Sequence, residues 1–271
     1  MQVVVDSLLT NYTRLGKGKT VVVLHGWGDN IAGIAPFLKG LSARYDVVAM
    51  DVPGFGGTQA PATSWGLDEY AGFLQSFLQK LNIKPYAIVG HSNGGAIAIR
   101  AIAHGLKTEK LVLLASAGVR GENKKSVGVA RVITKVGKVL AKPLSQKTQR
   151  KLRSSVYSTL GSDMLVAEHM QETFKRIVAD DVREDATHVT QPTLLIYGQD
   201  DVSTPVNIGL TLQAAIPTSK IKLYLALVIC CRQMQRKLFF QRSRSFLHDR
   251  SYNRFFWSSV SQDARLYASK Y

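Results

Sequence analysis

The chain has 271 residues, of which 45% are hydrophobic and 20% charged, and this balance is typical of a globular protein with one large domain or one domain carrying an insertion. A domain of that size buries enough apolar surface to fold without disulfides or metal, and the only cysteines, Cys230 and Cys231, are adjacent, which argues against a disulfide framework and against a metal site. The net charge of +16 suggests a polyanionic partner, but no recognition motif accompanies it, and we expect no nucleic-acid role.

The amino-terminal stretch and the apolar runs bear on location. The first nine residues lack a basic region and contain Asp6, so they make a poor signal peptide. The longest apolar runs, such as residues 223–231, are too short to span a bilayer. Together with the sparse cysteines, these features predict a cytoplasmic protein.

Short apolar runs alternate with helical stretches along most of the chain. This alternation predicts an α/β fold with a mostly parallel central sheet flanked by helices, since strands buried on both faces read as continuous β-branched or Leu runs. The spacing also predicts helices over residues 69–81 and 93–104. The predicted strands are residues 3–5, 20–25, 45–51, 86–89, 111–115, 193–197 and 221–225.

The alternation stops near residue 119. Residues 119–186 show helical periodicity without a strand, with an apolar face and a basic opposite face between residues 124 and 153. We interpret them as a helical cap inserted into a core of residues 1–118 and 187–226, followed by a divergent tail of residues 227–271. The basic face is interpreted as a solvated helix surface; the alternatives are contact with an anionic membrane, to which the tail could contribute, and a rim that attracts substrate.

A strand-to-helix turn at Gly90-His91-Ser92-Asn93-Gly94 carries the strongest chemical signal. A serine on such a turn projects its hydroxyl from the sheet edge, and glycines two positions before and after it avoid clashes. The amino-terminal end of the helix adds a partial positive charge and N–H groups near a developing oxyanion. The pattern predicts Ser92 as an acyl-accepting nucleophile.

Three further motifs, in the same chain order, make the sequence resemble the α/β-hydrolase family from about residue 3 to about residue 226. The stretch His25-Gly26-Trp27-Gly28 is similar to the family's oxyanion loop, and the resemblance implies the backbone N–H groups of Trp27 and Asn93 as the oxyanion hole. Residues 51–58 match the turn after the next strand.

The fourth motif, residues 198–205, resembles the family's acid-bearing loop. The family places its acid three residues after the glycine, here Gly198, and the resemblance therefore implies Asp201, with Asp200 as a solvated neighbour. A dinucleotide fingerprint is excluded because position 31 is Ile, and no phosphate-binding lysine motif is present. A serine at position 92 also argues against the branches of the family that use an aspartate nucleophile.

The histidine expected after the last strand is missing. The family's chain order is Ser, Asp, His, and position 228, where the histidine is expected, is Val228. The only later histidine, His248, would need a rearranged final segment to act. His25 and His91 are expected to shape turns, His104 and His188 to be surface or structural residues, and His169 to lie on the cap surface or face the pocket.

The tail departs from the rest of the chain in composition. No glycine follows Gly209 and no proline follows Pro217, while both cysteines and a net charge of +9 fall within residues 220–271. We hypothesise that the reading frame shifts near residues 222–227, because the shifted codons of Leu227 and Val228 permit Gly-His. The alternative is a divergent or alternatively spliced terminus whose aromatic and basic residues bind a partner or membrane.

These features predict a serine hydrolase that acts on an ester, amide or related acyl group of a small molecule and needs no metal or organic cofactor. Loss of one member of such a triad costs on the order of 10⁴ to 10⁶ in rate. The alternatives are a non-catalytic binding protein on a hydrolase scaffold and C–C bond cleavage or lyase chemistry at the same residues. The sequence leaves substrate and oligomeric state open.

Overall fold

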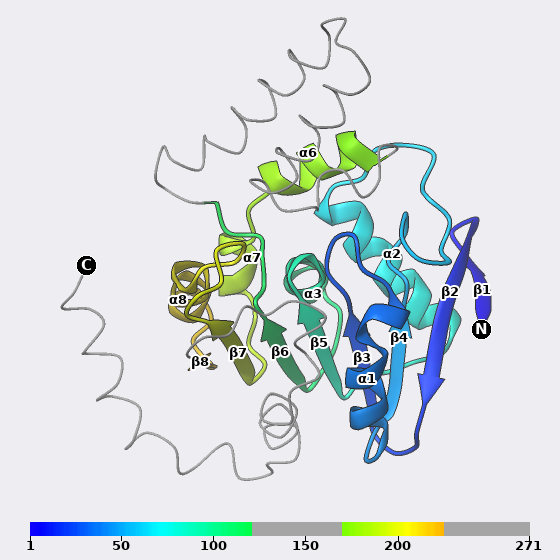
Figure 1. The fold of residues 1–271 in the computed structure, drawn as a ribbon, viewed down its shortest axis with the longest axis horizontal. Coiled ribbons are helices and arrows are strands. Elements are labelled where there is room, and N and C mark those ends of the chain that lie inside the picture. Colours follow the sequence, from blue (N-terminus) through cyan, green and yellow to red (C-terminus); the bar gives the residue numbers. More distant parts are fainter. Residues whose placement is uncertain (121–169, 225–271) are drawn as a thin grey trace, which may run out of the picture.

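The computed structural model of the chain describes residues 1–120 and 170–224, which form a central sheet with helices on both faces (Figure 1). The strands are β1 (Gln2–Val5), β2 (Leu8–Leu15), β3 (Thr20–Leu24), β4 (Asp46–Met50), β5 (Ala87–His91), β6 (Lys110–Leu114), β7 (Thr193–Gly198) and β8 (Ser219–Tyr224). The helices of the described ranges are α1 (Ile31–Ser42), α2 (Leu67–Lys80), α3 (Asn93–Ala103), α6 (Gln171–Ala179), α7 (Arg183–Thr187) and α8 (Val206–Ala215).

The sheet confirms the predicted fold class. Its strand order is β1-β2-β4-β3-β5-β6-β7-β8, and every pair from β4 to β8 is parallel. The first two strands form an antiparallel edge that the sequence did not predict in full, since β2 was missed. Thr, Asn and Arg interrupt its Leu and Tyr residues, so they form no continuous apolar run. The two-residue turn before it, Asp6-Ser7, uses left-handed backbone at both positions without a glycine to mark it.

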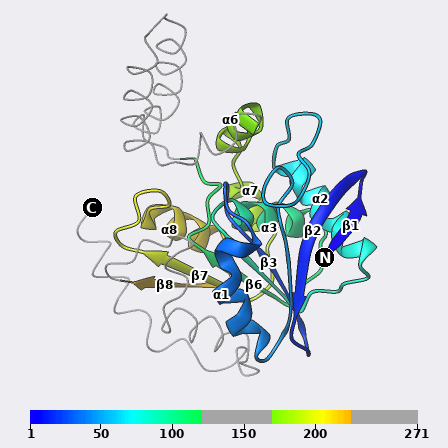
Figure 2. The ribbon, with the colours of Figure 1, turned by 45° about the vertical axis from the view of Figure 1, so that its right-hand side comes forward.

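The parallel strands separate two apolar layers. Successive side chains of a strand point to opposite faces, so Val22 and Leu24 belong to one layer while Val21 and Val23 belong to the other. Helix α1 covers the second layer, and α2, α3, α7 and α8 contribute to the first, as Figure 2 shows with α1 in front of the sheet. Burial on both faces explains why these strands are continuous runs of Val, Ile and Leu.

Two of the helices were predicted within two residues of their observed ends, and two were not predicted. Helices α2 and α3 match residues 69–81 and 93–104 closely. Helix α1 carries Gly33, Pro36 and Gly40, which conceal the helical spacing of its four buried apolar residues. Helix α8 is short and has no acidic first turn or basic last turn to mark its ends.

The predicted cap is described only in its last part. Residues 171–179 form α6, which lies above the carboxyl ends of the strands in Figure 1, and α7 packs against α3 and α8. The remainder of the predicted cap, residues 121–169, lies outside the described residues, as does the chain beyond residue 224. The division into core, cap and tail stays a prediction. In the described ranges, each helix is too short or too polar to cross a membrane.

Candidate active site

Ser92 occupies a strained turn between β5 and α3. Its φ of 50° and ψ of −118° lie in a region of backbone angles that residues other than glycine rarely adopt, and such a conformation costs about 1–3 kcal/mol. Hydrogen bonds hold the strain in place: Ser92 N donates to Leu114 O at 3.0 Å, and Ser92 O accepts from Gly95 N and Ala117 N, each at 3.0 Å. The turn leaves Ser92 partly exposed between buried neighbours.

The glycines of this turn permit close backbone contact, as their spacing predicted. A Cβ atom on Gly90 would lie 2.5 Å from the Cα of Gly95, and one on Gly94 would lie 2.6 Å from the carbonyl oxygens of Leu24 and His25. Because these neighbours are backbone atoms, they cannot rotate away. The start of α3 is thereby held against the end of β3, where the oxyanion loop begins.

The loop of residues 25–28, which the family resemblance implied as the oxyanion loop, lies beside Ser92. A Cβ atom on Gly26 would lie 3.2 Å from the Cβ of Ser92, which places the backbone of this loop next to the Ser92 side chain. Asn93 is the first residue of α3, a position whose amide hydrogen has no partner within the helix. The buried Oδ1 of Asn93 makes no hydrogen bond within the described ranges.

Trp27, the other residue implied in the oxyanion hole, packs between two aromatic rings. Its indole lies 4.7 Å from the ring of Phe55 and 5.2 Å from that of Phe174 in α6, measured between centroids. Met170, just before α6, packs against Gly54, where a Cβ atom would lie 2.4 Å from the Met170 methyl carbon. The cap-side segment therefore rests on the oxyanion loop and on the turn after β4 through apolar contacts.

His25 has a structural role, as predicted. Its Nε2 accepts from Val52 N at 2.9 Å, so its Nδ1 carries the proton and donates to Gly26 O at 2.8 Å. Burial lowers the pKa of His25 below its ordinary value, although Asp29 and Asp51 oppose that shift. The neutral ring follows also from the acceptor role of Nε2, and the 4.0 Å approach of Nε2 to Asp51 is therefore not an ion pair.

Asp51 ties the surroundings of the oxyanion loop together. Its Oδ1 accepts from Ile31 N at 2.7 Å, at the start of α1, and its Oδ2 accepts from Gly57 N at 2.8 Å and from Asn11 Nδ2 at 2.7 Å. A Cβ atom on Gly56 would lie 2.2 Å from this carboxylate. The carboxylate thus joins β2, the start of α1 and the turn after β4.

Asp201 lies at the same edge of the sheet, after β7. It is 3% exposed, and its Oδ1 accepts from Ser203 N at 3.0 Å and Thr204 N at 2.9 Å. Its neighbour Asp200 is exposed, and the family resemblance implied Asp201 as the acid and Asp200 as a solvated neighbour. Backbone donors hold one carboxylate oxygen in place, a common way to fix the acid of a catalytic triad.

Ser92 follows β5 and Asp201 lies in the loop after β7, and β6 separates these two strands. Since neighbouring strands lie about 4.8 Å apart, the backbones of β5 and β7 are about 10 Å apart across the sheet. A hydrogen-bond chain joins the two strands: Tyr197 OH in β7 donates to Ser116 O at 2.8 Å, and the next amide, Ala117 N, donates to Ser92 O. An imidazole spans a gap of this kind in a catalytic triad.

None of the histidines of the described ranges was predicted to act as the base, and their surroundings agree. His104 is the C-cap of α3, at the far end of that helix from Ser92. His188 is exposed, with its Nδ1 3.1 Å from Glu184 O. His91 is buried in β5 with its Nδ1 beside Gly26. The other positions considered, His169, Val228 and His248, lie outside the described residues.

Sequence reasoning missed two buried polar residues near the site. Tyr197 is fully buried, and burial raises its pKa well above the ordinary value, so the phenol stays protonated and can donate. Arg100 is the only charged residue of α3, and this isolated charge in a helix otherwise made of Asn, Gly, Ala and Ile was a usable signal. In the described ranges no group of three or more His, Cys, Asp or Glu is arranged to hold a metal ion.

A comparison with protein families matches residues 19–127 to the alpha/beta hydrolase fold. Among characterised proteins, the chain is 28% identical over 228 residues to a 2-hydroxy-6-oxononadienedioate/2-hydroxy-6-oxononatrienedioate hydrolase of Cupriavidus pinatubonensis, an alignment that covers 76% of this chain and 78% of that protein. The sequence is thus similar to hydrolases well beyond the turn around Ser92.

Solved structures agree on the fold. An esterase from Exiguobacterium antarcticum superposes with a TM-score of 0.73 at 19% identity, covering 92% of this chain and 99% of that one. A meta-cleavage product hydrolase from Pseudomonas fluorescens superposes with a TM-score of 0.67 at 22% identity, covering 91% and 96%. At these identities the likeness concerns the fold, and the two proteins differ in the substrates that their names state.

Proposed function

We propose that this chain, an enzyme with the α/β-hydrolase fold, is a serine hydrolase acting on an acyl group of a small molecule. The observation that carries the proposal is the left-handed backbone of Ser92 on the turn between β5 and α3. Strain of this kind persists where the surrounding structure enforces it, and it clusters at functional sites. The hydrogen bonds of the Ser92 backbone enforce it here, and Gly90 and Gly94 permit the close packing around it.

In the proposed reaction, the hydroxyl of Ser92 attacks the carbonyl carbon of an ester, amide or related group. The N–H groups of Trp27 and Asn93 stabilise the oxyanion that develops, and the first turn of α3 adds its partial positive charge. Asp201 orients and charges the base that accepts the serine proton. The oxyanion then collapses, and the base returns its proton to the departing alcohol or amine, which leaves the acyl group on Ser92. Water, deprotonated by the same base, attacks the acyl-enzyme and releases the acid and the free Ser92 hydroxyl.

The base is the part of the proposal that the described residues do not supply. An imidazole has to fill the gap of about 10 Å between the strands of Ser92 and Asp201. We propose that a frameshift near residues 222–227 replaced a Gly-His pair at Leu227 and Val228. Sequencing the gene across this region tests the idea: it fails if no one- or two-base change restores Gly-His there.

The names of similar proteins suggest two kinds of substrate. The relative from Cupriavidus pinatubonensis is named for hydrolysis of 2-hydroxy-6-oxononadienedioate, and a structural neighbour is an esterase. Both chemistries start from an activated serine, so the arrangement around Ser92 is compatible with either. Assays with p-nitrophenyl butyrate and with 2-hydroxy-6-oxononadienedioate, run on the same preparation, separate them.

The decisive experiment compares Ser92→Ala with Ser203→Ala. Ser203 is an exposed serine on the loop of Asp201, so its replacement removes a hydroxyl of the same type without touching the proposed nucleophile. Both variants are tested in the chain as written and in a frame-corrected chain. We expect turnover in the corrected chain, lowered by about 10⁴-fold or more in Ser92→Ala and unchanged in Ser203→Ala. Substrate binding without turnover in the corrected chain would instead indicate a binding protein on a hydrolase scaffold.

A further inference from the structure

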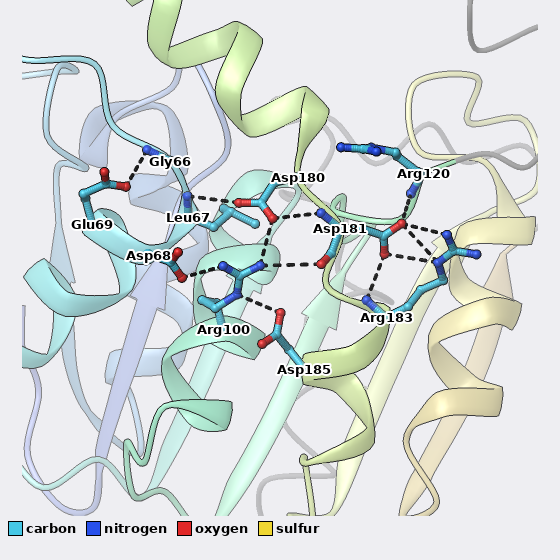
Figure 3. Close-up of polar contacts among 10 residues, drawn as sticks. All are labelled: Gly66, Leu67, Asp68, Glu69, Arg100, Arg120, Asp180, Asp181, Arg183 and Asp185. Atoms are coloured by element: carbon cyan, nitrogen blue, oxygen red, sulfur yellow. Dashed lines mark hydrogen bonds and ion pairs between the residues drawn. The ribbon is translucent and has the colours of Figure 1, made fainter.

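Arg100 lies near the end of α3, eight residues after Ser92, and its side chain is only 10% exposed. Its guanidinium donates to three carboxylates that come from three different elements, as Figure 3 shows. Nη1 donates to Asp68 in the first turn of α2 at 2.5 Å, Nη2 to Asp180 at the end of α6 at 2.8 Å, and Nε to Asp185 in α7 at 2.7 Å.

The charges of this cluster depend on the guanidinium. Burial alone would lower the pKa of Arg100, but the hydrogen bonds that it donates to the three carboxylates raise that pKa, so the group stays charged. Three carboxylates gather around one cation, and without it they would repel one another at close range. The planar guanidinium of an arginine spreads five N–H donors over three nitrogens in a fixed geometry, whereas a lysine carries its three donors on a single nitrogen.

One arm of the cluster holds α6. Asp180 is the residue after that helix, and besides accepting from Arg100 it accepts from Leu67 N at 3.4 Å. Farther along the same helix, Phe174 packs on the indole of Trp27. Helix α6 therefore connects the helix that carries the nucleophile to the loop that carries the implied oxyanion donor.

We propose that Arg100 is a positioning residue: by holding Asp180, it fixes α6, and through Phe174 it fixes Trp27 relative to the helix of Ser92. The catalytic meaning of this coupling rests on the proposed function. The physical coupling does not, since it consists of contacts between described residues that exist without substrate or turnover.

The coupling is tested by hydrogen exchange and by tryptophan emission. The chain has three tryptophans, and a background of Trp65→Phe and Trp257→Phe leaves Trp27 as the only reporter. In that background, Asp180→Asn removes the α6 arm of the cluster, and the matched control Asp185→Asn removes the α7 arm. Arg100→Met removes all arms, and Arg100→Lys tests the need for the fork.

If Arg100 acts through α6, Asp180→Asn and Arg100→Met raise amide exchange about tenfold in residues 171–179 and 26–30 and change the emission of Trp27. Exchange in β1 and β2 stays within about twofold, and Asp185→Asn leaves the oxyanion loop unchanged. Arg100→Lys restores less than half of the effect. The proposal is overturned if Asp180→Asn and Asp185→Asn affect residues 26–30 equally, or if neither does.

A third measurement distinguishes a failure of this proposal from a failure of the proposed function. The rate at which a fluorophosphonate labels Ser92 is compared in the frame-corrected chain with and without Asp180→Asn. If amide exchange changes as expected but Ser92 is labelled in neither protein, the coupling through α6 is supported and the proposed serine hydrolase function is refuted. Labelling that is equally fast in both proteins, with altered exchange, refutes the positioning role of Arg100. Should Arg100→Met fail to fold, the two aspartate variants decide the question without it.

Discussion

Gly94→Ala provides a sharp test of the close packing behind Ser92. The new methyl carbon would lie 2.6 Å from the carbonyl oxygens of Leu24 and His25, which is 0.8 Å inside the 3.4 Å at which ordinary contact begins. Both neighbours are backbone atoms of the central sheet, so α3 has to move away from β3. Overpacking of this kind costs about 1–3 kcal/mol, against about 0.5–1 kcal/mol gained by replacing a helical glycine.

The expected result is a net loss of about 1 kcal/mol in the free energy of unfolding, the difference between the centres of these two ranges, measured by urea denaturation. Thermal unfolding should show a midpoint lowered by about 2–4 °C, since each kcal/mol shifts a domain of this size by that amount. Fluorophosphonate labelling of Ser92 should slow in the folded variant, because the movement of α3 displaces the turn that presents the hydroxyl.

Gly72→Ala is the matched control. Gly72 lies in α2, is exposed, and a Cβ atom there would meet nothing within 4 Å. The same chemical change should therefore stabilise the protein by about 0.5–1 kcal/mol and leave labelling unchanged. An unfolding midpoint of Gly94→Ala at or above that of the parent would refute the argument, and so would equal losses in the two variants.

Three further predictions concern the polar groups around the site. Because burial lowers the pKa of His25 below 6.5, the unfolded chain binds a proton there that the folded chain does not. The free energy of unfolding should therefore decrease below about pH 6.5, by up to about 1.4 kcal/mol per pH unit. Urea titrations at pH 7.5 and 5.5 measure this decrease, and His25→Gln should lack the contribution of His25 to it. Tyr197→Phe should lower the free energy of unfolding by about 1–3 kcal/mol because it leaves the buried Ser116 carbonyl without its donor. The control is Tyr12→Phe, since the Tyr12 hydroxyl makes no hydrogen bond within the described ranges, and it should change stability by less than about 0.5 kcal/mol. Asn30→Ala should cost about 1 kcal/mol in thermal unfolding by removing the cap of α1, and a preserved midpoint would contradict that role.

The local parts of the fold could be predicted because their causes lie in adjacent residues. Val21 to Leu24 and Leu111 to Leu114 are apolar without interruption, which predicts strands covered on both faces. The glycines beside Ser92 predict a tight turn because backbone sterics act over a few residues. The elements that escaped prediction have their causes elsewhere: α1 is stabilised by packing on the sheet despite its glycines and proline, and β2 by pairing with β1 and β4.

The sequence by itself determined the strand-to-helix turn at Ser92, the order of the motifs and the parallel core, because propensity, apolar spacing and glycine placement are properties of neighbouring residues. Only the tertiary structure decided that Asp201 and Ser92 are separated by one strand, that His25 is a neutral acceptor, and that Arg100 gathers Asp68, Asp180 and Asp185. Those relations join residues that are between 27 and 109 positions apart in the chain, and no local pattern encodes them. Their physical origin is the burial of charge and polar atoms, which forces each group to find a partner wherever the folded chain supplies one.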